Sequence, residues 1–190
     1  MIDCARLAKA AASLNTAAFG PMEGDISIKN TKKSLSAAKA MEEAKELIRQ
    51  FILSGFTKIH IDTSMHLGDD SSKRLDTKII AERGAVLAEV AEEAYHKLKE
   101  ASLHAVHPVY IVGSEVPIPG GSQSEEENIQ ITRVEDLRET IEEFKNSFYA
   151  HGMMAVWQNV IAVVVQPGVE FGEDSIHEYN HEAANISVIH

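Results

Sequence analysis

The chain has a single cysteine, Cys4, among its 190 residues, which leaves no internal disulfide and no thiolate metal cluster. No stretch approaches the roughly 20 continuous apolar residues of a membrane span. Asp3 also interrupts the position where a secretory signal would carry an apolar run. These absences favour a cytoplasmic protein without a membrane span.

The chain has fewer basic than acidic residues. Lys and Arg number 18 against 29 Asp and Glu, for a formal net charge of -11. Such a balance argues against nucleic acid or an anionic membrane surface as the main partner. The content of 44% hydrophobic and 25% charged residues is that of an ordinary globular domain, so we expect one hydrophobic core.

Three segments carry apolar residues at the three- and four-residue spacing of an amphipathic helix. They predict helices over residues 35–54, 77–100 and 133–151. Gly55 and Gly152 follow the first and the third segment, and glycine there is typical of a helix C-terminus.

The helix starts have their own signals. Asp76 or Thr77 is expected to cap the second helix, and Thr132 with Glu135 has the spacing of a capping box for the third. From Ser175 onward the sequence predicts the start of a further helix.

Three apolar, β-branched runs predict strands over residues 57–62, 108–113 and 160–165. The last two are nearly continuous in apolar residues, as expected of strands buried on both faces. Strands that alternate with helices predict an α/β fold with parallel strands, paired in sequence order, and three helices on one outer face. Both architectures of this kind, the open doubly wound sheet and the (β/α) barrel, bind ligands at the carboxyl ends of the strands.

Carboxylates lie at or after the end of each predicted strand: Asp62, Glu115 and Glu170. If the strands lie side by side, these side chains can converge. A convergent set could hold a divalent metal through oxygen ligands, or supply a general acid and base for sugar phosphate chemistry. The alternative is that they cap helices or pair with Lys and Arg.

Other polar residues follow the same strands. Ser64 and His66 could contact a phosphate, and Gln166 could direct its amide toward the same ligand site at the carboxyl ends of the strands. Each of these residues could equally make an ordinary loop contact. His60 and Asp62 are two residues apart and point to one side of the strand. A lone strand histidine is more often a core residue with its hydrogen bonds satisfied.

Residues 177–181 (His-Glu-Tyr-Asn-His) match the H-E-x-x-H pattern of zinc hydrolases, which makes His177 and His181 weak metal candidates. Such short patterns arise by chance, and few residues follow His181 to supply a third ligand. The competing interpretation is an exposed helix N-terminus capped by Asp174 or Ser175.

Four stretches together resemble one family. They are residues 55–65 (Gly-Phe-Thr-Lys-Ile-His-Ile-Asp-Thr-Ser-Met), 81–84 (Ala-Glu-Arg-Gly), 113–121 (Gly-Ser-Glu-Val-Pro-Ile-Pro-Gly-Gly) and 164–171 (Val-Val-Gln-Pro-Gly-Val-Glu-Phe). Their order is similar to that of the non-catalytic, Z-type subunit of class II D-tagatose-1,6-bisphosphate aldolase. The resemblance runs from about residue 35 to about residue 179.

The resemblance implies a TIM-type (β/α) barrel subunit in the catabolism of galactitol, N-acetylgalactosamine or related sugars. It would support the activity and stability of a separate catalytic class II aldolase subunit, which carries the zinc. Family members have also been labelled tagatose 6-phosphate kinases, but no nucleotide-binding glycine loop is visible here. A barrel enzyme in its own right, a lyase, epimerase or kinase with a sugar phosphate ligand, is the alternative, and a zinc hydrolase is a remote one.

Residues 1–34 match the family pattern poorly and form a separate N-terminal segment before a domain of residues 35–190. A complete (β/α) barrel takes about 250 residues, and three or four strands cannot close one. We therefore expect a partial barrel with parallel strands and open sheet edges.

Overall fold

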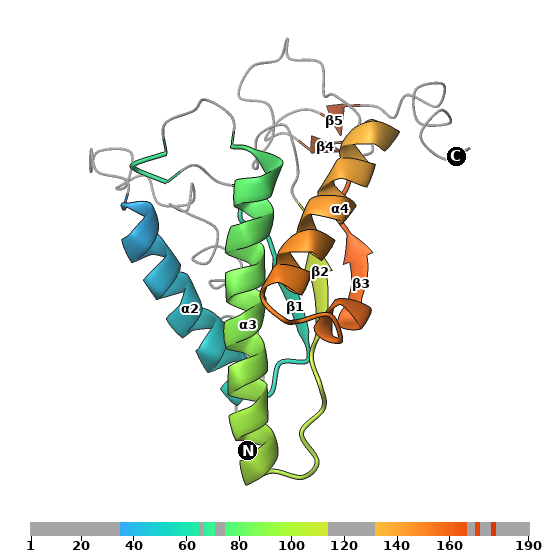
Figure 1. Cartoon of the computed structure of the whole chain (residues 1–190). Coiled ribbons are helices and arrows are strands. Elements are labelled where there is room, and N and C mark those ends of the chain that lie inside the picture. The colour runs from blue at the N-terminus through green and yellow to red at the C-terminus, as the bar shows by residue number, and fades with distance from the viewer. Residues whose placement is uncertain are drawn as a thin grey trace.

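The computed structural model describes residues 35–64, 67–70, 75–113 and 132–166, together with the backbone of residues 170–171 and 176–177. Its elements alternate between helix and strand over most of this length (Figure 1). In chain order they are α2 (Ala37–Leu53), β1 (Lys58–Ile61), α3 (Thr77–Ala101), β2 (Val109–Val112), α4 (Val134–Ala150), the 3-10 helix η2 (Val156–Asn159), β3 (Val160–Val163), β4 (Glu170–Phe171) and β5 (Ile176–His177).

The sheet has three parallel strands in the order β1-β2-β3, which confirms the predicted pairing. Ile61 lies beside Val112 and Val112 beside Val163, so the three carboxyl ends are level. An α/β fold with parallel strands is therefore established. Closure into a barrel stays a prediction, as does the division of the chain at residue 35.

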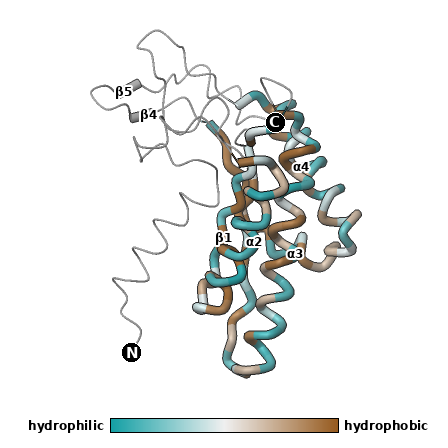
Figure 2. The backbone as a smooth tube through the Cα atoms, turned by 90° about the vertical axis from the view of Figure 1, so that its left-hand side faces the viewer, coloured by the Kyte–Doolittle hydropathy of each residue, from teal (hydrophilic) through white to brown (hydrophobic). Residues whose placement is uncertain are grey.

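The helices α2, α3 and α4 lie on one face of this sheet, as predicted (Figures 1 and 2). Alternate strand residues point toward them and are buried: Ile59 and Ile61 on β1, Tyr110 and Val112 on β2. The helices contribute Ile48, Ile52, Leu87, Phe144 and Phe148 to the same core. Burial of these large apolar side chains is the main stabilising term, at about 1.5–3 kcal/mol each.

Gly84 sets how closely α3 and α4 approach. A Cβ atom at this position would lie 2.6 Å from Cε1 of Phe144, whose ring is fully buried. The missing side chain therefore makes room for the Phe144 ring between the two helices and the sheet.

Several of the predicted helix ends are confirmed. Gly55 follows α2 with φ of +88°, and Gly152 follows α4 with φ of +73°, a backbone region that favours glycine. The Asp76 carboxylate accepts a 2.8 Å hydrogen bond from the backbone N–H of Lys78 and caps α3.

The capping box predicted for α4 is wrong. The N-cap residue is Arg133, and its side chain makes no cap hydrogen bond. The hydroxyl of Thr132 instead accepts a 2.8 Å hydrogen bond from the backbone N–H of Gln166. The capping-box pattern assigned the Thr132 hydroxyl to the first turn of α4, but it accepts its hydrogen bond from Gln166, which is distant in the sequence.

The prediction that residues 160–165 are buried on both faces is also wrong. β3 lies at the side of the three-stranded sheet, and the side chains of Ile161 and Val165 are 58% and 42% exposed. A continuous apolar run indicates a strand but does not say whether the strand is central, because that depends on which strands pair with it.

The helix predicted from Ser175 onward is contradicted at its first turn. Ile176–His177 forms β5, which pairs antiparallel with β4, placing Glu170 opposite His177 and Phe171 opposite Ile176. The intervening sequence Gly-Glu-Asp-Ser is rich in turn formers, a composition that helix starts and strand connections share.

Candidate functional site

Three of the predicted site residues share the carboxyl edge of the sheet. Asp62 directly follows β1, and Ser64 and Gln166 each lie three residues after the end of their strand, β1 and β3 respectively. Because β1 and β3 are separated only by β2, their ends are about 10 Å apart. This confirms that the strand ends meet at one edge, where parallel α/β folds commonly place their ligands.

The other two predicted carboxylates are not tested. Glu115 lies outside the described residues, and for Glu170 only the backbone, in β4, is described. Convergence of Asp62, Glu115 and Glu170 therefore stays a prediction. Across the part of the chain that the structure describes, no group of three or more His, Cys, Asp or Glu side chains is arranged to hold a metal ion.

Ser64 presents the clearest ligand signal at this edge. Asp62 Oδ1 accepts a 2.9 Å hydrogen bond from the backbone N–H of Ser64, which fixes the turn after β1. The Ser64 Oγ atom is buried and has no hydrogen-bond partner within the described ranges. Buried hydroxyls are nearly always paired, so this atom is free to donate to, or accept from, a bound polar molecule.

Gln166 is held in place from the opposite side of the edge. Thr132 donates its backbone N–H to the Gln166 carbonyl at 3.0 Å, and the Thr132 hydroxyl accepts from the Gln166 N–H at 2.8 Å. Gln166 is 6% exposed. The pair of bonds joins the segment before α4 to the segment after β3 at this edge.

The segment after β1 is anchored by α3, through contacts that sequence reasoning missed. Arg83 donates two hydrogen bonds to the carboxylate of Asp70, at 2.6 and 3.0 Å, and both side chains are only about a tenth exposed. Such a bidentate pair fixes both distance and orientation. Thr63 adds a 2.7 Å hydrogen bond from its hydroxyl to the carbonyl of Ile80. Arg83 lies in residues 81–84, one of the stretches that resemble the family, and this was the only indication in the sequence that Arg83 has a specific role.

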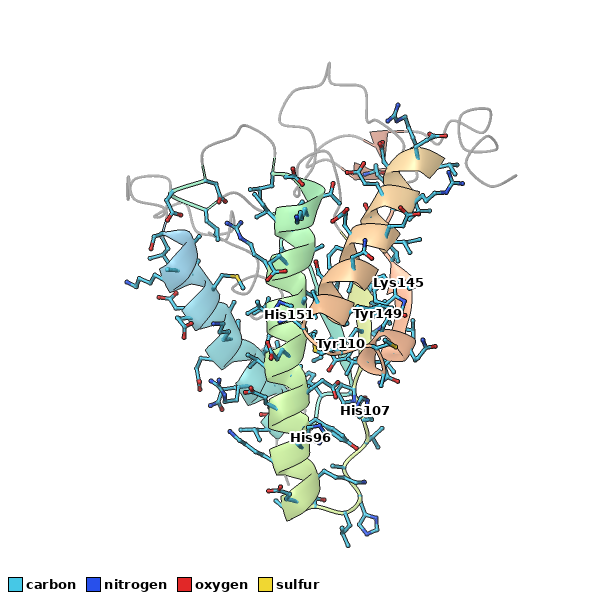
Figure 3. The ribbon with its side chains drawn as sticks, viewed as in Figure 1. His96, His107, Tyr110, Lys145, Tyr149 and His151 are labelled. Atoms are coloured by element: carbon cyan, nitrogen blue, oxygen red, sulfur yellow. The ribbon has the colours of Figure 1, made fainter. Side chains whose placement is uncertain are left out.

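A second polar cluster lies at the amino end of the sheet, and sequence reasoning missed it entirely. The buried carboxylate of Glu92 accepts from the hydroxyl of Tyr110 at 2.5 Å and lies 2.9 Å from Nε2 of His107. Nδ1 of His107 lies 3.1 Å from Nδ2 of Asn159. Figure 3 shows His107 and Tyr110 toward the lower end of the strands.

Tyr110 is held as a proton donor in this cluster. Burial, together with the hydrogen bond to Glu92, raises the pKa of the Tyr110 hydroxyl far above its usual value. The Tyr95 ring packs edge-on against His107, with centroids 4.4 Å apart. Glu92 is buried and is bonded to both Tyr110 and His107, so these side chains form a mutually satisfied network within the fold.

The remaining histidine candidates are located only in part by the structure. His60 is half-buried, on the face of β1 opposite to Ile59 and Ile61. His66 and His181 lie outside the described residues. His177 begins no helix, because Ile176–His177 is a strand, so the helical spacing that the zinc pattern requires is absent at that residue.

The arrangement of the carboxyl edge can be compared with known proteins. Residues 13–188 match the D-tagatose-1,6-bisphosphate aldolase subunit GatZ/KbaZ-like family. The chain belongs to this family. The match covers most of its length, and it includes all the described elements.

Curated relatives carry the corresponding name. The D-tagatose-1,6-bisphosphate aldolase subunit GatZ of Klebsiella oxytoca is 42% identical over 148 residues, covering 78% of this chain and 34% of the relative. The protein of the same name from Salmonella agona is 39% identical over 161 residues, covering 85% of this chain and 37% of the relative. The chain therefore spans about a third of the length of these relatives.

A solved structure supports the fold. The crystal structure of a probable tagatose 6 phosphate kinase from Sinorhizobium meliloti 1021 superposes with a TM-score of 0.63 at 33% identity. The superposition covers 83% of this chain and 34% of that one. No helix within the described ranges is long and apolar enough to cross a membrane.

Proposed function

We propose that this family member acts as an accessory, non-catalytic subunit of D-tagatose-1,6-bisphosphate aldolase in the breakdown of galactitol and N-acetylgalactosamine. The observation that carries the proposal is the family match over residues 13–188, with relatives named as subunits of this aldolase. The partner is a separate class II catalytic subunit, which holds the zinc. The proposed place of action is the cytoplasm.

The accessory role is tested by mixing. A class II tagatose-bisphosphate aldolase catalytic subunit is incubated at a temperature that inactivates it, alone, with this chain, or with the GatZ subunit of Salmonella agona as a positive control. We expect this chain to lengthen the half-life of aldolase activity. Protection by the Salmonella subunit without any effect of this chain would show that the role needs residues that this chain does not contain.

We propose, as a second candidate function, that the carboxyl edge binds a sugar phosphate. The observation that favours it is the buried Ser64 hydroxyl with no partner among the described residues. A phosphate oxygen or a sugar hydroxyl would complete its hydrogen bonding. Asp62 and Gln166 contribute polar groups to the same edge, and Glu115 and Glu170 are proposed to complete the pocket.

Calorimetric titration with D-tagatose 1,6-bisphosphate tests this site. We expect the chain to bind the sugar phosphate, and Ser64→Ala to weaken binding about tenfold, the cost of roughly 1.4 kcal/mol. Thr140→Val, on α4 and away from the strand ends, is the control. Inorganic phosphate binding as tightly as the sugar would indicate a bare anion site, and equal affinity in Ser64→Ala would remove Ser64 from the site.

A further inference from the structure

His151 occupies an unusual position between two carboxylates. It is the C-cap residue of α4, and its ring lies against α3 (Figure 3). Nε2 lies 2.9 Å from a carboxylate oxygen of Glu82, and Nδ1 lies 3.1 Å from one of Glu89. Glu82 and Glu89 are seven residues apart on α3, so they lie two turns apart on one helix face.

The geometry distinguishes the two protonation states of the ring. A neutral imidazole carries one N–H, so only one of the two contacts can be a hydrogen bond, and the other places a nitrogen lone pair against a carboxylate oxygen. The imidazolium donates from both nitrogens and satisfies both contacts. The end of α4 adds a favourable partial negative charge for a cation at this position.

The charged groups in contact with His151 are both acidic and both come from α3. From α3 the groups that face it are Glu82 and Glu89. The last turn of α4 (Ser147-Phe148-Tyr149-Ala150) and the following residues 152–159 carry no Asp, Glu, Lys or Arg. The hydrogen bond to Glu82, reinforced by that to Glu89, raises the pKa of His151 above its usual 6.5 even though burial acts in the opposite direction.

We propose that His151 is a proton-dependent clasp that fastens the C-terminal end of α4 to α3 while its ring is charged. When the imidazolium loses its proton, one of the two bridges becomes repulsive and this end of α4 loosens. Both helices are also connected to the candidate site. The Ile80 carbonyl of α3 accepts a hydrogen bond from Thr63, and α4 begins two residues after Thr132, which bonds to Gln166. Loss of the proton should therefore weaken the packing of α3 against α4, the two helices connected to that edge.

The sign of the pH dependence follows from the raised pKa. A group whose pKa is higher in the folded chain stabilises it fully below the unfolded value of about 6.5, and this contribution is lost as the pH rises through the folded value. The clasp is therefore closed in mildly acidic solution and open in alkaline solution. Glu82 and Glu89 are about half exposed, so salt should weaken the effect.

Proton NMR of the 190-residue chain tests the clasp directly by following the ring signals of His151 between pH 5.5 and 8.5. We expect a titration midpoint above 6.5 in the wild type, moving down toward 6.5 in the double variant Glu82→Gln with Glu89→Gln. The variant Glu100→Gln, at an exposed position about 16 Å further along α3 than Glu89, should leave the midpoint unaltered. A wild-type midpoint at or below 6.5 overturns the proposal, and this measurement needs no variant to fold.

Urea unfolding at pH 5.5 and 8.5 provides the stability measurement. We expect the wild type to lose more stability between these pH values than His151→Gln does. His104→Gln, which alters an exposed histidine in the turn after α3, should keep the wild-type pH dependence. Equal pH dependence in the wild type and His151→Gln would also overturn the clasp.

Discussion

The two ends of the parallel sheet hold their polar groups in different ways. At the amino end, Glu92, His107 and Tyr110 satisfy one another's hydrogen bonds within the protein. At the carboxyl end, the buried hydroxyl of Ser64 has no hydrogen-bond partner among the described residues, although Asp62 and Gln166 at the same edge each make hydrogen bonds within the protein. A completed network stabilises the fold, whereas an incomplete one in a rigid setting is the mark of a place for a ligand.

The largest effect that this comparison predicts is at Glu92. Replacing it with leucine leaves the buried Tyr110 hydroxyl without its acceptor and removes the partner of His107 Nε2. We expect the free energy of unfolding to fall by about 2–4 kcal/mol. Chemical denaturation measures it, with Glu93→Leu on the exposed face of α3 as a control that should change stability by less than about 0.5 kcal/mol. A small loss at Glu92 would mean that the amino-end network is not structural.

Tyr110→Phe should have the next largest effect. It removes the donor to Glu92 and keeps the ring, so we expect a loss of about 1–2 kcal/mol in denaturant unfolding. Tyr149→Phe removes a hydroxyl from a half-exposed ring and should be nearly neutral. If both variants lose the same amount, the hydrogen bond to Glu92 contributes nothing specific.

Thr132→Val examines the support of the carboxyl edge. Valine keeps the shape of the side chain but cannot accept the Gln166 N–H, so we expect a loss of about 1 kcal/mol and faster amide hydrogen exchange at Gln166. Thr140→Val removes a hydroxyl that bonds within α4 alone and should leave exchange at Gln166 unchanged. Unaltered exchange in Thr132→Val would argue that the bond does not rigidify this edge.

Ser64→Ala should have the smallest effect on stability. Because the hydroxyl has no partner among the described residues, its removal should leave the free energy of unfolding unchanged or raise it by up to about 1 kcal/mol. A clear loss would show that Ser64 makes a structural hydrogen bond. In that case the contrast between the two ends of the sheet, and the ligand role of Ser64, would both fail.

Much of the fold could be predicted because it depends on local spacing. Apolar residues such as Ile48, Leu87 and Phe144 repeat with the helical period and are buried where that period places them. Gly55 and Asp76 mark helix ends through backbone chemistry that needs no distant partner. The site could be predicted only as an edge, because Asp62, Ser64 and Gln166 follow strands whose parallel order was evident.

The sequence by itself determined the order of α2, β1, α3, β2, α4 and β3 and the parallel pairing of the three strands, because these depend on periodicity and on residues close in the chain. Its resemblance to known stretches indicated the family. Three contacts were decided by the tertiary structure alone. The Thr132 hydroxyl accepts a hydrogen bond from Gln166 rather than capping α4, and Glu92 bonds to Tyr110 and His107. The His151 ring lies between Glu82 and Glu89. Each of these contacts joins residues well separated along the chain. Which donor meets which acceptor is set by how helices pack across the sheet, and no local pattern carries that information.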